Sequence, residues 1–108
     1  MTTSNKKSKA VRTLEALLGE ELTFGNMIRS ERMAMELSQD AFGKLLGIKR
    51  AYVCDLEKGR TVASVDQAIR FADLLGLSRM LFIQLAMEAQ IRKHGLDYRV
   101  QLVQKKAS

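Results

Sequence analysis

The stretch LSQDAFGKLLGIKRAYVCDLEKG, residues 37–59, contains two short helical patterns separated by a glycine. Ser38 can cap the first helix, because its hydroxyl accepts hydrogen bonds from the unpaired N–H groups of a first helical turn. Phe42, Leu45 and Leu46 then recur at helical spacing, and Gly47 can end the helix by adopting a positive φ. We therefore expect a first helix that stops at Leu46.

A second helix is expected from Arg50 to Lys58, ended by Gly59. At about 100° per residue, Val53 and Leu56 point to one side of this helix. The opposite, presented side carries Ala51, Cys54, Asp55 and Lys58. Gly43 lies where two short helices crossing at a steep angle bring their backbones together, and its small size permits that approach. These features predict a helix-turn-helix arrangement.

The residues that fit this arrangement are Leu37, Ser38, Gln39, Phe42, Gly43, Leu46, Gly47, Val53, Leu56, Glu57 and Gly59. In these residues the chain resembles the XRE family of helix-turn-helix proteins, which includes phage repressors and Cro, over about Ile28 to Phe82. The resemblance implies that the first helix braces on the sugar-phosphate backbone through Gln39 and that the second lies in the major groove. It also implies base-reading positions at Lys49, Arg50, Ala51 and Asp55.

The residues themselves support part of this assignment. Lys49 and Arg50 stand at the N-terminal end of the presented helix, where both the helix dipole and their own charge favour an anionic partner. Arg50 can donate two hydrogen bonds to guanine. Asp55 can accept from a cytosine amino group, orient Arg50, or remain a solvated helix residue. Lys49 departs from the Ser or Thr cap usual in the family, so we expect a weaker helix start and one more positive charge.

Two further roles are implied by the resemblance. Lys58, Arg60 and Thr61 lie where the family approaches the DNA backbone, and such phosphate contacts provide affinity but little specificity. Glu57 falls at the buried margin of the second helix, where a carboxylate needs a paired donor. We expect Arg32 to supply it, as an internal ion pair that supports the fold and does not contact DNA.

Composition and length suit a small helical domain. The 108 residues contain no proline, and helix-forming residues are abundant. We predict an all-α fold: a five-helix, repressor-like helix-turn-helix domain with an extra N-terminal helix and a possible short C-terminal β-strand. The expected boundaries are a disordered basic arm at 1–8, the extra helix at 9–21, the helix-turn-helix domain at 22–94, and a strand with a basic tail at 95–108.

The charge balance indicates a polyanion as partner. Eighteen Lys and Arg face twelve Asp and Glu, a formal charge of +6. The single cysteine excludes an internal disulfide, and no apolar run or signal sequence indicates a membrane or secretion, so we expect a cytoplasmic protein. Because no carboxylate, metal-ligand or phosphate-cradling cluster has a usable spacing, we expect no enzyme activity, catalytic residue, metal or cofactor.

The C-terminal third suggests a partner protein. The helix expected from Ser78 to about His94 is apolar almost all round, so its second side needs a cover, either a second subunit or another protein. Residues 96–103 alternate between apolar and polar, a strand pattern that must find an edge on its own copy or on a partner. The predicted dimer or partner contacts are Phe82, Leu85, Met87, Tyr98, Val100 and Leu102.

Two functions fit these expectations. The first is a sequence-specific repressor that binds double-stranded DNA as a homodimer, with an inverted-repeat operator whose half-sites lie about one helical turn apart. The second is the antitoxin of a toxin–antitoxin pair, which neutralises a cognate toxin protein and represses its own operon. Both require DNA binding, and the neighbouring gene would distinguish them.

Overall fold

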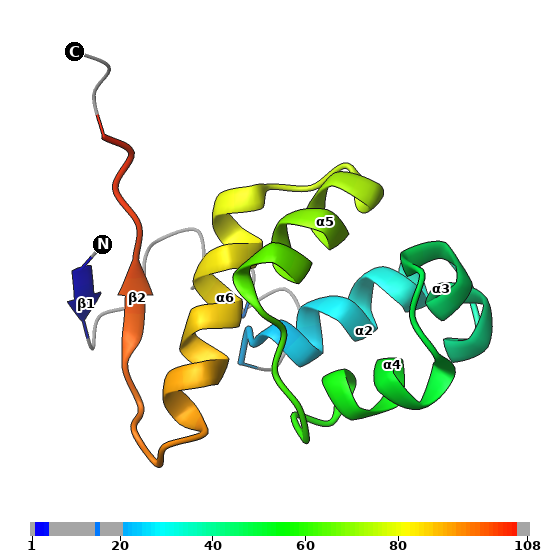
Figure 1. Cartoon of the computed structure of the whole chain (residues 1–108), viewed down its shortest axis with the longest axis horizontal. Coiled ribbons are helices and arrows are strands. Elements are labelled where there is room, and N and C mark those ends of the chain that lie inside the picture. Colours follow the sequence, from blue (N-terminus) through cyan, green and yellow to red (C-terminus); the bar gives the residue numbers. More distant parts are fainter. Residues whose placement is uncertain (1, 5–14, 16–20, 106–108) are drawn as a thin grey trace.

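The computed structural model describes residues 2–4, 15 and 21–105. The elements in this part are β1 (Thr2–Ser4), α2 (Phe24–Ala34), α3 (Gln39–Leu46), α4 (Arg50–Glu57), α5 (Val65–Leu75), α6 (Arg79–Arg92) and β2 (Arg99–Gln101) (Figure 1). The predicted fold class, an all-α domain with a short C-terminal strand, is confirmed. Most of the predicted extra helix at 9–21 lies outside the described residues.

Side-chain caps and glycines set the helix ends. The Ser38 hydroxyl accepts a hydrogen bond from the backbone N–H of Ala41 at 3.1 Å, and Gly47 ends α3 with a φ of 73°. Ser64 and Gln67 form the reciprocal capping box that starts α5. α4 begins at Lys49 without any side-chain cap. The start of α4 therefore depends on its packing against the neighbouring helices.

One apolar core joins helices α2 to α6. α2 packs against α4 and α6, α3 against α4 and α5, and α5 against α6. Phe24 and Phe82 meet edge to face with ring centroids 5.8 Å apart. The largest fully buried apolar side chains of the core cluster are Leu22, Ile28, Phe42, Leu46, Val53, Leu56, Phe71, Phe82 and Leu85. Val53 and Leu56 thus join the presented helix to the domain interior.

The C-terminal strand finds its edge within its own chain. β2 pairs antiparallel with β1, with Thr3 opposite Val100. Figure 1 shows the two strands side by side next to α6. The strand therefore pairs within its own chain, and not with a second copy or another protein as expected. Thr2–Ser4, which were expected in a disordered arm, form the partner strand.

This pairing also corrects half of the predicted partner contacts. Phe82 and Leu85 are completely buried in the core, and Val100 is only 1% exposed. The physical reason is that α6 is covered from inside the chain: the helical core covers one side, and β2 packs against the helix as well. Met87, Tyr98 and Leu102 remain accessible in part or in full.

A buried ionic cluster ties β2 to α6 and to the N-terminal segment. Arg99 Nη1 lies 3.1 Å from Oε1 of Glu88, and Arg99 Nη2 lies 2.6 Å from Oε1 of Glu21. The backbone N–H of Val100 donates to Oε2 of Glu88 at 2.9 Å. Glu15 contributes a third carboxylate, 3.4 Å from Arg99. Side chains from three parts of the sequence therefore converge on one guanidinium group.

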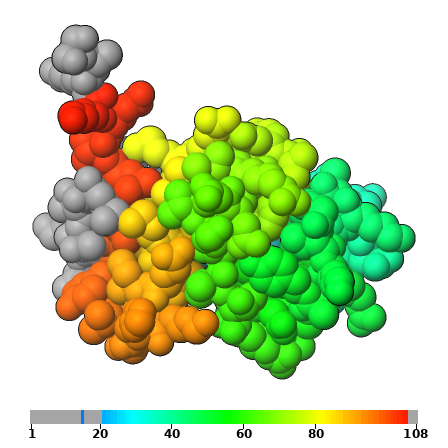
Figure 2. Space-filling model, viewed as in Figure 1, coloured from blue at the N-terminus to red at the C-terminus, as the bar shows by residue number. Residues whose placement is uncertain are grey.

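Beyond β2 the described chain leaves the helical body. Figure 2 shows this segment extending away from the packed helices. Val103 is 67% exposed there. None of the helices in the described part is long and apolar enough to span a membrane.

Candidate DNA-binding surface

The angle between α3 and α4 depends on a glycine. A Cβ atom at Gly43 would lie 2.6 Å from the carbonyl oxygen of Ile48 and 3.3 Å from Cγ2 of Val53. The Ile48 N–H donates to the Gly43 carbonyl at 2.8 Å, which closes the turn. Any side chain at this position would push the two helices apart, so the sequence prediction for Gly43 has a direct structural basis.

α4 presents the residues expected to read bases. Val53 and Leu56 are buried, whereas Arg50 and Ala51 are exposed. A shallow depression of about 580 Å³ on this side is lined by Lys49, Arg50, Ala51, Cys54, Asp55 and Arg60. The structure therefore brings all four predicted base-reading residues together, and it adds Arg60 from the following loop.

The electrostatics of this depression favour an anion. In the described part of the chain, neither Lys49 nor Arg50 has an ion-pair partner. Asp55 faces Arg60, with Oδ1 and Nη1 3.7 Å apart, and does not orient Arg50. Both side chains of that pair are about half exposed or more, so their attraction is weak and screened by salt. Two unpaired cations and one loosely paired cation remain available to phosphate or guanine.

An ion pair behind α4 holds the helix from the other side. Arg32 donates from Nε to Glu57 Oε2 at 2.7 Å and from Nη2 to Oε1 at 3.1 Å. Its Nη1 also donates to the Leu37 carbonyl at 3.0 Å. The hydrogen bond to Glu57 raises the pKa of Arg32 above its ordinary value. The expected Arg32–Glu57 pair is thus present, and it joins α2, the turn before α3, and α4.

Gln39 is connected to the same pair. Its Nε2 donates to Glu57 Oε1 at 3.3 Å, and the side chain is half-buried at the start of α3. An amide nitrogen carries two N–H groups. One of them is used by Glu57 and the other can serve a phosphate, so the contact to Glu57 is compatible with the implied brace on the DNA backbone.

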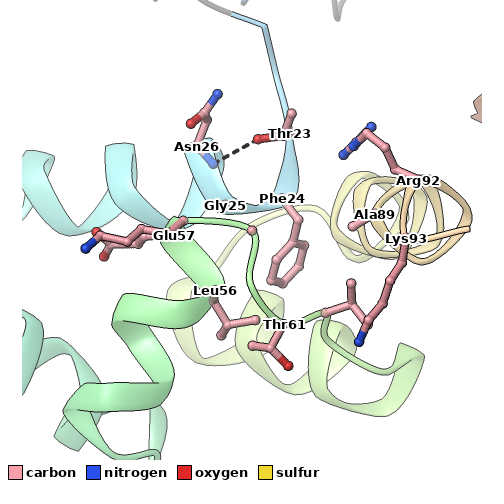
Figure 3. A pocket seen from close by; sticks show the side chains of 13 residues that line it. Thr23, Phe24, Gly25, Asn26, Leu56, Glu57, Thr61, Ala89, Arg92 and Lys93 are labelled. Carbon is pink, nitrogen blue, oxygen red and sulfur yellow. Dashed lines mark hydrogen bonds between the residues drawn. The ribbon is translucent and has the colours of Figure 1, made fainter. Parts of the chain in front are cut away.

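The other expected backbone contacts lie around a separate groove. This groove, of about 370 Å³, lies between the start of α2, the end of α4 and the end of α6, and Lys58 and Thr61 line it. Arg92, the last residue of α6, and Lys93, which follows it, also line the groove. Figure 3 shows the Lys93 side chain reaching toward the loop that contains Thr61. Sequence reasoning missed these two cations, because only the fold brings the end of α6 beside Lys58.

Comparisons with known proteins give a matching family and two similar solved structures. A family model described as a helix-turn-helix domain matches residues 23–82, more than half of the chain. A crystal structure from Nostoc punctiforme PCC 73102, of a proposed antidote protein of a plasmid maintenance system, has a TM-score of 0.60 and 20% identity; the match covers 68% of this chain and 80% of that one. The restriction-modification controller protein C.AhdI from Aeromonas hydrophila has a TM-score of 0.49 and 30% identity, over 55% of this chain and 86% of that one.

The protein is therefore a DNA-binding protein of the helix-turn-helix class. It belongs to the helix-turn-helix domain family, and the resemblance to XRE proteins is confirmed. No curated protein is significantly similar to it in sequence. The family and the exposed cationic edge of α4 together indicate a regulator that acts through DNA.

Proposed function

We propose that the protein is a sequence-specific transcriptional repressor that binds an inverted-repeat operator as a homodimer in the cytoplasm. The observation that supports this most directly is the exposed edge of α4, where Lys49, Arg50, Ala51 and Asp55 line one depression with Arg60. An α-helix fits the major groove of B-form DNA, and the free side of α4 is the side that would enter it.

Each residue has a proposed role at that surface. Arg50 donates two hydrogen bonds to a guanine, the Ala51 methyl packs on a thymine methyl, and Asp55 accepts from a cytosine. Lys49 adds a donor at the helix start. Gln39, Lys58, Arg60 and Thr61 contact phosphates and set the register of the protein on the duplex.

The homodimer is proposed from the apolar surface that the fold leaves open. Of the predicted partner residues, Met87, Tyr98 and Leu102 remain for this role. Tyr98 is 44% exposed. Large apolar side chains are also exposed at Leu74, Met80, Leu96 and Val103. Two copies related by a two-fold axis would place their α4 helices in successive major grooves, about 34 Å apart.

Selection of bound duplexes from a random pool tests this function. We expect an inverted repeat whose half-site centres are about one helical turn apart. We also expect binding to weaken as salt rises, because phosphate contacts release counterions. A protein that enriches no motif would contradict sequence-specific recognition. A motif without two-fold symmetry would contradict the dimer and leave the recognition surface in place.

An antitoxin role is the second candidate. The exposed Leu96, Tyr98 and Val103 lie outside the matched helix-turn-helix segment and could contact a toxin. The structural neighbour from Nostoc punctiforme is itself described as an antidote protein, although at 20% identity the likeness concerns the fold alone. Co-expression with the product of the adjacent gene would test this role: a stable complex that relieves growth arrest supports it, and an adjacent product that neither binds nor arrests growth contradicts it.

A further inference from the structure

The recognition helix is short and has only two buried apolar anchors. α4 has eight residues, and its anchors Val53 and Leu56 lie about 60° from each other around the helix axis. Two anchors on the same side hold a helix against the core but leave rotation about its own axis weakly determined. Since this rotation decides where Arg50 and Asp55 point, something else must fix it.

The Arg32–Glu57 pair holds one side of α4, near the C-terminal end of the helix. At about 100° per residue, Glu57 lies roughly 70° to one side of the line midway between the two apolar anchors. Its carboxylate receives two hydrogen bonds from Arg32 and a third from Gln39. This contact resists rotation from one side and at one end only.

Tyr52 lies on the opposite side of α4, near the N-terminal end of the helix. The same geometry puts it roughly 70° to the other side of that line. Its hydroxyl donates to Oε1 of Gln67 at 2.8 Å, and the same oxygen accepts from the backbone N–H of Ser64 at 3.2 Å. Tyr52 is therefore bonded to the capping box of α5, a rigid helix start.

α5 also holds the turn that leads into α4. The Arg70 guanidinium donates from Nη2 to the Leu46 carbonyl at the end of α3. This contact fixes the chain four residues before α4 begins at Arg50. Thus α5 holds α4 at two points. Gln67 bonds the Tyr52 side chain in the N-terminal half of α4, and Arg70 bonds the backbone of the turn that leads into α4.

We propose that Tyr52 is a positioning residue that sets the rotation of α4 through Gln67 and thereby decides which bases Arg50 and Asp55 can reach. The inference rests on the proposed sequence-specific function and deepens it. Tyr52 itself touches no base in this scheme. Its loss should therefore change selectivity for base sequence, whereas the general attraction to phosphate should remain.

The test compares Tyr52→Phe with Ser78→Ala in the full chain. Ser78→Ala is a matched control, because it also removes one hydroxyl hydrogen bond, from the Leu81 N–H at 3.2 Å, but at the start of α6 away from α4. Dissociation constants are measured for the selected duplex, for duplexes with single base changes, and for a random duplex, all well below the melting temperature.

We expect Tyr52→Phe to weaken binding to the selected duplex by about threefold to tenfold, the effect of one hydrogen bond. Binding to the random duplex should stay within about twofold of the wild type, and the penalty for base changes under Arg50 should shrink. Ser78→Ala should change neither. Gln67→Glu, which keeps an acceptor for Tyr52, should preserve selectivity, and Gln67→Leu should behave like Tyr52→Phe.

Several results would overturn the inference. One is an equal loss on selected and random duplexes, and another is no loss on either. Additive effects of Tyr52→Phe and Gln67→Leu in the double variant would also contradict it, since one broken hydrogen bond cannot be lost twice. A wild-type chain without any sequence preference would instead contradict the proposed function, and with it the basis for this inference.

Discussion

The carboxylate of Glu88 and the guanidinium of Arg99 face each other inside the protein, 3.1 Å apart, with side chains that are 1% and 10% exposed. The second oxygen of Glu88 accepts a hydrogen bond from the Val100 N–H. One carboxylate therefore pairs with the Arg99 charge and also with a backbone N–H of β2. A charge removed from water at this depth is stable only while it is paired.

Arg99→Met should therefore destabilise the protein by about 3–5 kcal/mol, because Glu88 is left as an unpaired buried charge. Adding Glu88→Gln should recover part of that loss, since a neutral amide still accepts from the Val100 N–H. Urea unfolding of both variants measures the effect, with Arg29→Met on the exposed side of α2 as the control. A loss below about 1 kcal/mol for Arg99→Met would match an exposed pair and refute the buried cluster.

Glycine-to-alanine changes in α2 and α3 should lower the stability of the protein, which is opposite to their usual effect in helices. Alanine normally stabilises a helix interior by about 1 kcal/mol relative to glycine. At Gly25, however, a Cβ would lie 2.5 Å from the Leu56 carbonyl oxygen, and at Gly43 it would lie 2.6 Å from that of Ile48. We expect both variants to lose about 1–3 kcal/mol of stability. Thermal melts that show either variant more stable than the wild type would contradict these close backbone contacts.

Arg50 and Arg60 should separate specificity from general affinity. Arg50→Ala should cost about 1–3 kcal/mol on the selected duplex and relax the preference at one base pair. Arg60→Ala should weaken all duplexes alike and reduce the slope of affinity against salt by about one. Fluorescence anisotropy titrations at several salt concentrations measure both. If the two variants lost affinity equally on selected and random DNA, the assigned roles of base reader and phosphate contact would be wrong.

A pH dependence is expected at the junction of α5 and α6. Arg79 donates to both carboxylate oxygens of Asp73, at 2.7 and 2.8 Å, and these hydrogen bonds lower the pKa of Asp73. A carboxyl group with a lowered pKa in the folded state stabilises the protein above its unfolded pKa, and this stabilisation is lost as the pH falls through the folded value.

The melting temperature of Asp73→Asn should therefore lie below that of the wild type at neutral pH. The difference should shrink as the pH falls below the ordinary aspartate pKa and vanish once the pH is below the lowered pKa of Asp73. Melting curves across that range provide the test. If the difference in melting temperature stayed constant at every pH, the ionised form of Asp73 would contribute nothing to the stability of the protein.

The helix-turn-helix unit was predictable because its determinants are local. Ser38, Gly43 and Gly47 act on neighbouring backbone atoms, and the spacing of Val53 and Leu56 defines the buried side of α4 without reference to the rest of the chain. The Arg32–Glu57 pair was predictable for a different reason: a carboxylate at a buried margin requires a donor, and the family resemblance indicated one.

The contacts of the C-terminal part were not predictable in this way. An apolar helix such as α6 needs a cover, but the sequence does not say whether that cover is a second chain or β2. In the sequence, Glu88 is one charge within a long helical segment, and Arg99 is one of the polar residues in the alternating pattern at 96–103. Only the packing of β2 on α6 brings them together, across 11 residues of sequence.

The pairing of β1 with β2 puts the two strands at one end of the molecule, and Figure 1 shows α3 and α4 at the opposite end. A dye, an affinity tag or a fused protein attached after residue 105 would therefore sit far from α4, the helix proposed to enter the groove. Such attachments offer a way to immobilise the protein on a sensor chip while its recognition helix stays open to the duplex flowing past.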